Sequence, residues 1–300
     1  MATAQQFRAA LTTTFAHASA APLGPTAILD VVERAQASGL IFDSGLPRDV
    51  IDELTRELER RGGNHPVVAL ESPSPRVARG DGREPELCAP DRDEAQTALA
   101  AAEATVHRAG ELRAPFVIVR LGAVRPVASD WPGARDRFLR GELDHERARR
   151  LMQTRDAAAE RSVDGAMRAL DRLARRAERA GVTLLVRNGR RYHDVPSARE
   201  LDDLRVELRG APVAPLLDVP AAHLLDVMGF APLALTLAAF APAPLCYFGD
   251  ACGAVGALAP GRGVVDLAAV RAALGDGARL AFSPWAGLAV DEIIAAVPQI

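Results

Sequence analysis

Eight short apolar segments, each followed by sequence typical of a helix, recur along the whole chain. They are rich in Val, Leu, Ile and Phe, as strands buried in a parallel sheet are. In chain order the predicted strands are Arg8–Phe15, Leu40–Asp43, Val67–Glu71, Phe116–Arg120, Val182–Arg187, Val213–Asp218, Leu245–Phe248 and Leu280–Ser283. This alternation predicts that all 300 residues form a single (β/α)8 (TIM) barrel domain.

The sequence between the strands carries helix signals. Pro47 stands at a first-turn position, and Met167, Leu170 and Leu173 recur at helical spacing. Helices are predicted over residues 25–38, 47–61, 91–110, 145–180, 197–208, 265–274 and 290–297. Two polar inserts, Ser72–Pro90 and Leu121–Asp144, follow strands. We therefore expect them to cover the mouth of the barrel, at the carboxyl ends of the strands.

Composition argues against several classes of partner. The formal net charge is −3 and the pI is about 6.1, so no overall positive field attracts nucleic acid or an anionic membrane. The uncharged stretch Val227–Phe248 is long enough to cross a bilayer, but its prolines favour a short helix and a strand. Cys88, Cys246 and Cys252 cannot all pair, which favours a reducing, cytoplasmic location. A homodimer is expected only by analogy with other barrels that carry mouth inserts.

Three segments of the second half carry a family resemblance. Ala177–Asn188 (AERAGVTLLVRN) is similar to a helix–strand unit that usually ends in Glu-Asn. Leu216–His223 (LLDVPAAH) is similar to a strand that ends in Asp with a His three residues on. Gly249–Leu267 is similar to a loop of the form Asp…His-Leu-Pro-Pro-Gly-Glu-Gly. In this order they resemble the xylose-isomerase-like barrels, the sugar phosphate isomerase/epimerase superfamily that also includes endonuclease IV. The resemblance implies a divalent metal such as Mn²⁺, Mg²⁺ or Zn²⁺, held at the mouth by carboxylates and a histidine.

The positions where the resemblance places metal ligands hold other residues. Asp218 and Asp250 remain. Where the resemblance leads us to expect Glu, this chain has Arg187, Arg262 and Ser283. Where it leads us to expect His, the chain has Ala221, Tyr247 and Ala257. A guanidinium can neither bind a metal ion nor lose its proton near neutral pH. The sequence therefore predicts no metal ligand set and no bound cofactor.

The replacements allow two interpretations. In the first, Arg187 takes the place of the ion and neutralises Asp218 and Glu71, since an unpaired buried carboxylate costs several kcal/mol. In the second, the arginines form a pocket for a small anion, because a guanidinium binds phosphate or carboxylate through two parallel hydrogen bonds. Both hold together if Arg120 or Arg262 is left over after pairing. The candidate substrate-binding residues are Arg120, Arg187, Asn188, Asp250, Arg262 and Ser283.

Three functions are compared. The first is a barrel that has lost metal-dependent catalysis and serves as a binding, regulatory or structural protein. The second is an isomerase, epimerase or lyase for a small anionic substrate (a sugar phosphate or a carboxylate), in which Glu71 or Asp218 is the base and Tyr247 the proton donor. The third, a phosphodiesterase similar to endonuclease IV, needs a metal cluster that six scattered histidines do not supply. Of these, His193 is expected in a solvated loop and His223 on an outer helix face.

Overall fold

Eight parallel strands close into a barrel in the spatial order β1-β12-β9-β8-β6-β4-β3-β2. The structure, a computed structural model, describes residues 9–17, 22–125, 131–284 and 288–300. The barrel strands are β1 (Ala10–Thr12), β2 (Leu40–Phe42), β3 (Val67–Ser72), β4 (Phe116–Val119), β6 (Thr183–Arg187), β8 (Val213–Asp218), β9 (Leu245–Tyr247) and β12 (Arg279–Phe282). The predicted (β/α)8 barrel is confirmed.

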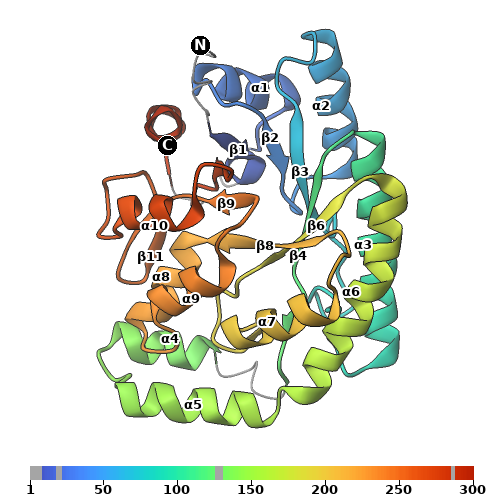
Figure 1. The fold of residues 1–300 in the computed structure, drawn as a ribbon. Coiled ribbons are helices and arrows are strands. Elements are labelled where there is room, and N and C mark those ends of the chain that lie inside the picture. Colours follow the sequence, from blue (N-terminus) through green and yellow to red (C-terminus); the bar gives the residue numbers. More distant parts are fainter. Residues whose placement is uncertain (1–8, 18–21, 126–130, 285–287) are drawn as a thin grey trace.

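Helices surround the strands, which converge in the middle of the molecule (Figure 1). They are α1 (Pro25–Arg34), α2 (Arg48–Arg60), α3 (Arg92–Glu111), α4 (Trp131–Leu139), α5 (His145–Ala157), α6 (Glu160–Ala180), α7 (Ala198–Glu207), α8 (Val219–Val227), α9 (Leu233–Phe240), α10 (Leu267–Leu274) and α11 (Val290–Ala296). None of the described helices combines the length and the apolar character needed to cross a membrane.

The side chains of β6 show how the strands build two apolar layers. Leu184 and Val186 belong to the large cluster between strands and helices. Leu185 belongs to the smaller cluster inside the barrel, with residues such as Ile118 and Leu216. Because side chains alternate along a strand, Arg187 falls on the same side as Leu185. The strand thus directs Arg187 into the barrel at its mouth.

Several predicted boundaries were wrong. The predicted strand Arg8–Phe15 is a three-residue strand followed by a 3-10 helix at Thr13–Ala16, and Arg8 lies outside the described residues. The helix predicted over 145–180 is divided into α5 and α6. No Gly or Pro marks this break. It lies beside Arg155, whose buried guanidinium binds the Glu200 carboxylate of α7, so a tertiary contact accompanies a bend that local sequence does not signal.

Short antiparallel ribbons at the mouth were not predicted. In the second insert, β5 (Gly122–Ala123) pairs with β7 (Asp194–Val195). A second ribbon, β10 (Asp250–Cys252) with β11 (Val255–Leu258), follows β9. Residues 126–130 of the second insert are outside the described part. The β5–β7 pairing brings the loop after β4 against the loop after β6, and both border the cavity at the mouth.

Candidate functional site

Arg187 lies between two carboxylates at the carboxyl ends of neighbouring barrel strands. Its Nη1 is 3.8 Å from Oε1 of Glu71, and its Nε is 3.7 Å from Oδ2 of Asp218. The three side chains are 9–12% exposed. Burial opposes the charge of the guanidinium, but attraction to Asp218 and Glu71 outweighs it and raises the pKa of Arg187. The site therefore contains a fixed buried cation.

Arg187 makes these two ion pairs without hydrogen bonds. Among the described residues no hydrogen bond joins its guanidinium to another group, and both ion-pair distances exceed hydrogen-bond length. A guanidinium has five N–H donors. Since Arg187 also lines the large cavity at the mouth, these donors remain to be satisfied by water or by a ligand.

Tyr247 of β9 completes the central group. Its hydroxyl donates to Oε1 of Glu71 at 2.5 Å, and the Arg187 guanidinium lies 5.8 Å from its ring centre. Burial, followed by the neighbouring Glu71, raises the pKa of Tyr247 well above its usual value. Tyr247 is thus a neutral donor at ordinary pH. The structure brings together all three residues predicted to be catalytic, Glu71, Asp218 and Tyr247, around Arg187.

Asn188 and Asp218 join the ends of β6 and β8. The Asn188 side chain donates to the Asp218 carbonyl at 3.1 Å and accepts from the Asp218 backbone N–H at 2.6 Å. Oδ1 of Asp218 accepts from the Ala221 N–H and caps α8. Asn188 therefore holds the strand ends in register, although it also lines the cavity.

A cavity of about 850 Å³ opens above Arg187. Its walls come from the β3–α3 loop, the end of β4 with β5, and the loop after β6. The charged lining residues are Arg76, Arg83, Arg120, Arg125, Arg187, Arg190, Arg191, Glu84, Glu86 and Asp194. Arginines outnumber carboxylates in this lining, seven to three, and carboxylates outside the lining also pair with Arg83, Arg125 and Arg187. Glu71, Asp218 and Tyr247 lie behind Arg187 and are not among the lining residues.

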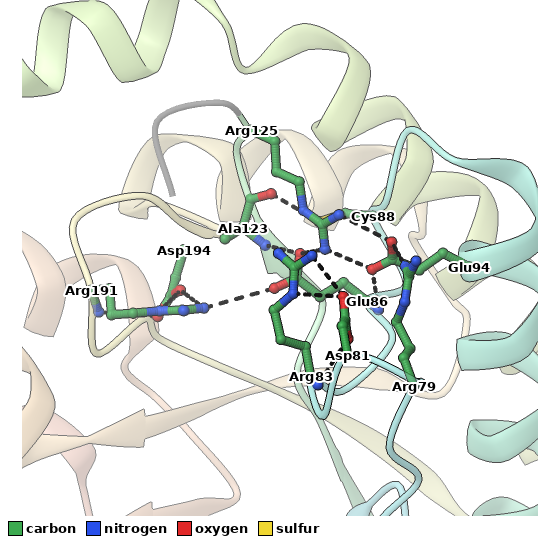
Figure 2. A network of polar contacts seen from close by, with 10 residues as sticks. All are labelled: Arg79, Asp81, Arg83, Glu86, Cys88, Glu94, Ala123, Arg125, Arg191 and Asp194. Carbon is green, nitrogen blue, oxygen red and sulfur yellow. Dashed lines mark hydrogen bonds and ion pairs between the residues drawn. The ribbon is translucent and has the colours of Figure 1, made fainter. Parts of the chain in front are cut away.

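Two carboxylates of the first insert are each shared by two arginines. Glu84 binds Arg76 at 2.6 Å and Arg120 at 2.7 Å. Glu86 accepts from Arg125 at 3.0 Å and lies 3.9 Å from Arg191 (Figure 2). These contacts fasten the two inserts and the loop after β6 together, and they leave arginine charge in excess near Glu84.

A buried carboxylate anchors the cavity wall from behind. Glu94 of α3 has a side chain that is 1% exposed, and it binds both Arg79 and Arg125 (Figure 2). The Arg125 contacts are 2.6 and 3.0 Å long. Although burial opposes it, hydrogen bonding and attraction to Arg125 lower the pKa of Glu94. The sequence does not reveal this network, because its partners are far apart in the chain.

Three other predicted site residues lie elsewhere. Asp250 is 2% exposed, and its carboxylate accepts from the backbone N–H groups of Ala251, Gly263 and Val265. It therefore holds the loop after β11 rather than lining the cavity. Arg262 is exposed on that loop, and Ser283 is half-buried just after β12. Neither lines the cavity.

The predicted settings of two histidines were wrong. His193 is fully buried, although it was expected in a solvated loop, and His223 is 6% exposed, although it was expected on an outer face. Both lie in segments whose packing depends on contacts with other elements. A third histidine, His17, was not singled out by the sequence; its Nε2 lies 3.3 Å from the buried Asp43.

Solved structures share this architecture along nearly the whole chain. A putative xylose isomerase from Rhodospirillum rubrum matches with a TM-score of 0.71 and 17% identity over 97% of both chains. The fold is that of a xylose-isomerase-like barrel. An L-ribulose 3-epimerase matches with a TM-score of 0.64 and 17% identity over 98% of this chain and 86% of the other. A 3-keto-D-glucoside 4-epimerase from E. coli matches with a TM-score of 0.63 and 14% identity over 93% and 94%. No family model and no curated protein matches the chain.

The residues at the centre of this xylose-isomerase-like barrel do not fit a divalent metal ion. Such an ion needs several oxygen or imidazole ligands. Here the Arg187 guanidinium lies within 4 Å of both central carboxylates, and its positive charge would repel a second cation. Within the described part of the chain, no group of three or more His, Cys, Asp or Glu residues has a geometry suited to a metal.

Proposed function

We propose that this barrel binds a small anion, a sugar phosphate or a carboxylate, on Arg187 at the mouth without a divalent metal. The observation that carries the proposal is the state of Arg187, which is buried between two carboxylates, makes no hydrogen bond to the described residues and lines the cavity. An oxyanion would satisfy donors that the described residues do not. In this proposal, the Arg187 guanidinium balances the charges of Glu71 and Asp218, a role that a metal ion would have in the barrels that this chain resembles.

The cavity walls support the proposal independently of Arg187. Arg76 and Arg120 share the single carboxylate of Glu84, so one positive charge is in excess there. The exposed Arg190 forms no ion pair with the described residues. These charges would raise the local concentration of anions and fix the orientation of a charged group.

Calorimetric titration with ribose 5-phosphate and with ribose tests the proposal. We expect the phosphate ester to bind at least about tenfold more tightly than ribose, and to lose affinity as salt rises. Arg120→Met should weaken binding of the ester by about 10-fold or more, since it removes a charged hydrogen-bond donor. The control is Arg149→Met, an exposed arginine on α5 outside the cavity. Equal affinity for ribose and its phosphate would reject the proposal.

A second candidate is an isomerase, epimerase or lyase that moves protons without a metal. The 2.5 Å hydrogen bond between Tyr247 and Glu71, beside Arg187, favours it. In this candidate Arg187 and Arg120 hold the anion, Glu71 or Asp218 accepts a proton, and Tyr247 donates one. Glu71→Gln should then lower turnover of a phosphorylated ketose by about 100-fold or more. Turnover at the wild-type rate in this variant would contradict the assignment.

A further inference from the structure

A second, smaller cavity lies behind the loop that follows β6. Its volume is about 50 Å³, and its walls come from that loop, from α5, from the start of α7, and from α8 and α9. Helix α9 packs against both α7 and α8, and α5 lies below them in the view of Figure 1. Most of the walls are apolar, with Met152, Leu225, Phe230 and Phe240 among them. At roughly 10–15 Å³ for each water-sized atom, the space has room for about three or four non-hydrogen atoms.

A short segment of backbone separates this cavity from the one at the mouth. Asn188, Gly189 and Asp194 border both cavities. Because Gly189 consists of backbone atoms alone, the two spaces come within the thickness of one residue. A Cβ at Gly189 would lie 2.6 Å from Cβ of Asp194, whose carboxylate accepts from the N–H groups of Arg190 and Arg191, both at 3.0 Å. A side chain at position 189 would therefore disturb the loop and fill the boundary between the two cavities.

Thr236 places an unpaired hydroxyl on the wall of the smaller cavity. This residue of α9 is 5% exposed, and no hydrogen bond joins its hydroxyl to another described group. By contrast, the Asn188 amide is bonded to the backbone of Asp218, and the Ser197 hydroxyl accepts from the Glu200 N–H. A buried hydroxyl without a partner is unfavourable, and cavities that stay empty are lined by apolar groups. The Thr236 hydroxyl therefore points to a ligand atom in this space.

The walls suit an aliphatic group that carries a single oxygen. The Tyr192 ring stacks on that of Phe230, with centres 4.6 Å apart and planes inclined by 17°, and both residues line the space. An alkyl group gains free energy when it leaves water for such walls, and one oxygen on it pairs with Thr236. The chain of a sugar carries a hydroxyl on nearly every carbon. Most of these hydroxyls would lose their bonds to water without replacement, which disfavours a sugar here.

We infer that this space is an aliphatic subsite, which holds the far end of an aliphatic carboxylate whose charged group lies on the arginines of the mouth. The aliphatic subsite is the space bordered by Gly189, Tyr192, Phe230, Ala231 and Thr236. The inference rests on the proposed anion site and chooses the carboxylate from the two ligand classes named there. The far end of the ligand comprises about three or four non-hydrogen atoms, and an oxygen among them forms a hydrogen bond with the Thr236 hydroxyl.

A series of straight-chain carboxylates from acetate to octanoate tests the inference. Binding to the full chain is followed by ligand-observed NMR titration. We expect similar affinities for the short acids, a rise of about tenfold or more over the next two or three carbon atoms, and no further rise once the subsite is full. Ala231→Leu, which fills the subsite, should remove this rise. Ala238→Leu, on the exposed side of α9, is the matched control and should keep it.

Two results of this series would overturn the inference. One is an affinity that does not depend on chain length. The other is a dependence on chain length that is the same in Ala231→Leu as in the wild-type protein, because nonspecific binding of longer chains would produce it.

Thr236→Val tests the hydrogen bond in the subsite. Each of the longer acids is compared with the acid in which a hydroxyl replaces its terminal methyl group, for example pentanoate with 4-hydroxybutanoate. For acids that reach the subsite, the ratio of the two affinities should shift by about fivefold toward the methyl form in this variant. Loss of folded protein would lower both affinities and leave the ratio unchanged. An unshifted ratio at every chain length would overturn the inference.

Titration with 1-propanol separates failure of the subsite from failure of the anion site. This neutral probe has an alkyl group and one oxygen, so it should bind weakly to the wild-type protein and not to Ala231→Leu. If acetate and the longer acids bind equally and 1-propanol does not bind, the subsite is rejected and the anion site stands. If 1-propanol binds in this way but no acid binds, the anion site is rejected, and with it the carboxylate ligand.

Discussion

Replacing Arg187 with Met tests whether its charge stabilises the barrel. Met keeps much of the side-chain volume and leaves Glu71 and Asp218, both nearly buried, without the cation that contacts each of them. Removing one partner of a buried ion pair typically costs about 3–5 kcal/mol. Because a domain is stable by only about 5–15 kcal/mol, the loss should be plain in urea unfolding followed by circular dichroism at neutral pH.

The loss should come from the two carboxylates that Arg187 contacts. Arg187→Met combined with Glu71→Gln should recover part of the loss, because one of the two unpaired charges is gone. Arg149→Met is the control and should stay within about 0.5 kcal/mol of wild type. A similarly small change for Arg187→Met at neutral pH would refute the reasoning.

Three further predictions follow from single contacts. Glu84→Gln frees Arg76 and Arg120 from their shared carboxylate. Calorimetry should therefore show that ribose 5-phosphate binds this variant several-fold more tightly than it binds the wild-type protein. Weaker binding would contradict this expectation and show that Glu84 positions the arginines for the ligand. In an ultraviolet titration of the folded protein, Tyr247 should stay protonated beyond pH 10, because burial and Glu71 raise its pKa well above that value; an ionisation below pH 10 that is lost in Tyr247→Phe would contradict this. With a thiol reagent near pH 8, the exposed Cys252 should react fast, whereas Cys88 should not, because burial raises its pKa to about 12; fast modification of Cys88 would contradict its burial.

The barrel and the place of Arg187 could be predicted because both follow from local periodicity. Apolar runs bounded by helices give parallel strands, and strand alternation sends residue 187 to the interior at the mouth. The placement of Arg120 in the cavity lining follows from the same reasoning, since it comes directly after β4. Strand ends in this fold converge on one face, so a residue's position along its strand is enough to place it.

The sequence does not reveal contacts that a local pattern does not contain. Asp250 comes soon after a strand end, but backbone N–H groups of the following loop satisfy its carboxylate. The Glu94–Arg125 pair and the His17–Asp43 pair join segments that only the closed barrel brings together. In the structure, the missing side chain of Gly45 makes room for the His17 ring.

Mn²⁺ binding to the chelator-treated protein, followed by electron paramagnetic resonance, tests the central claim most directly. If the Arg187 guanidinium balances Glu71 and Asp218, the wild-type protein should leave the signal of free Mn²⁺ unchanged. Arg187→Glu, which places a third carboxylate at this position, should bind the ion and lower that signal. Stoichiometric, tight Mn²⁺ binding by the wild-type protein that is lost in Asp218→Asn would contradict the account.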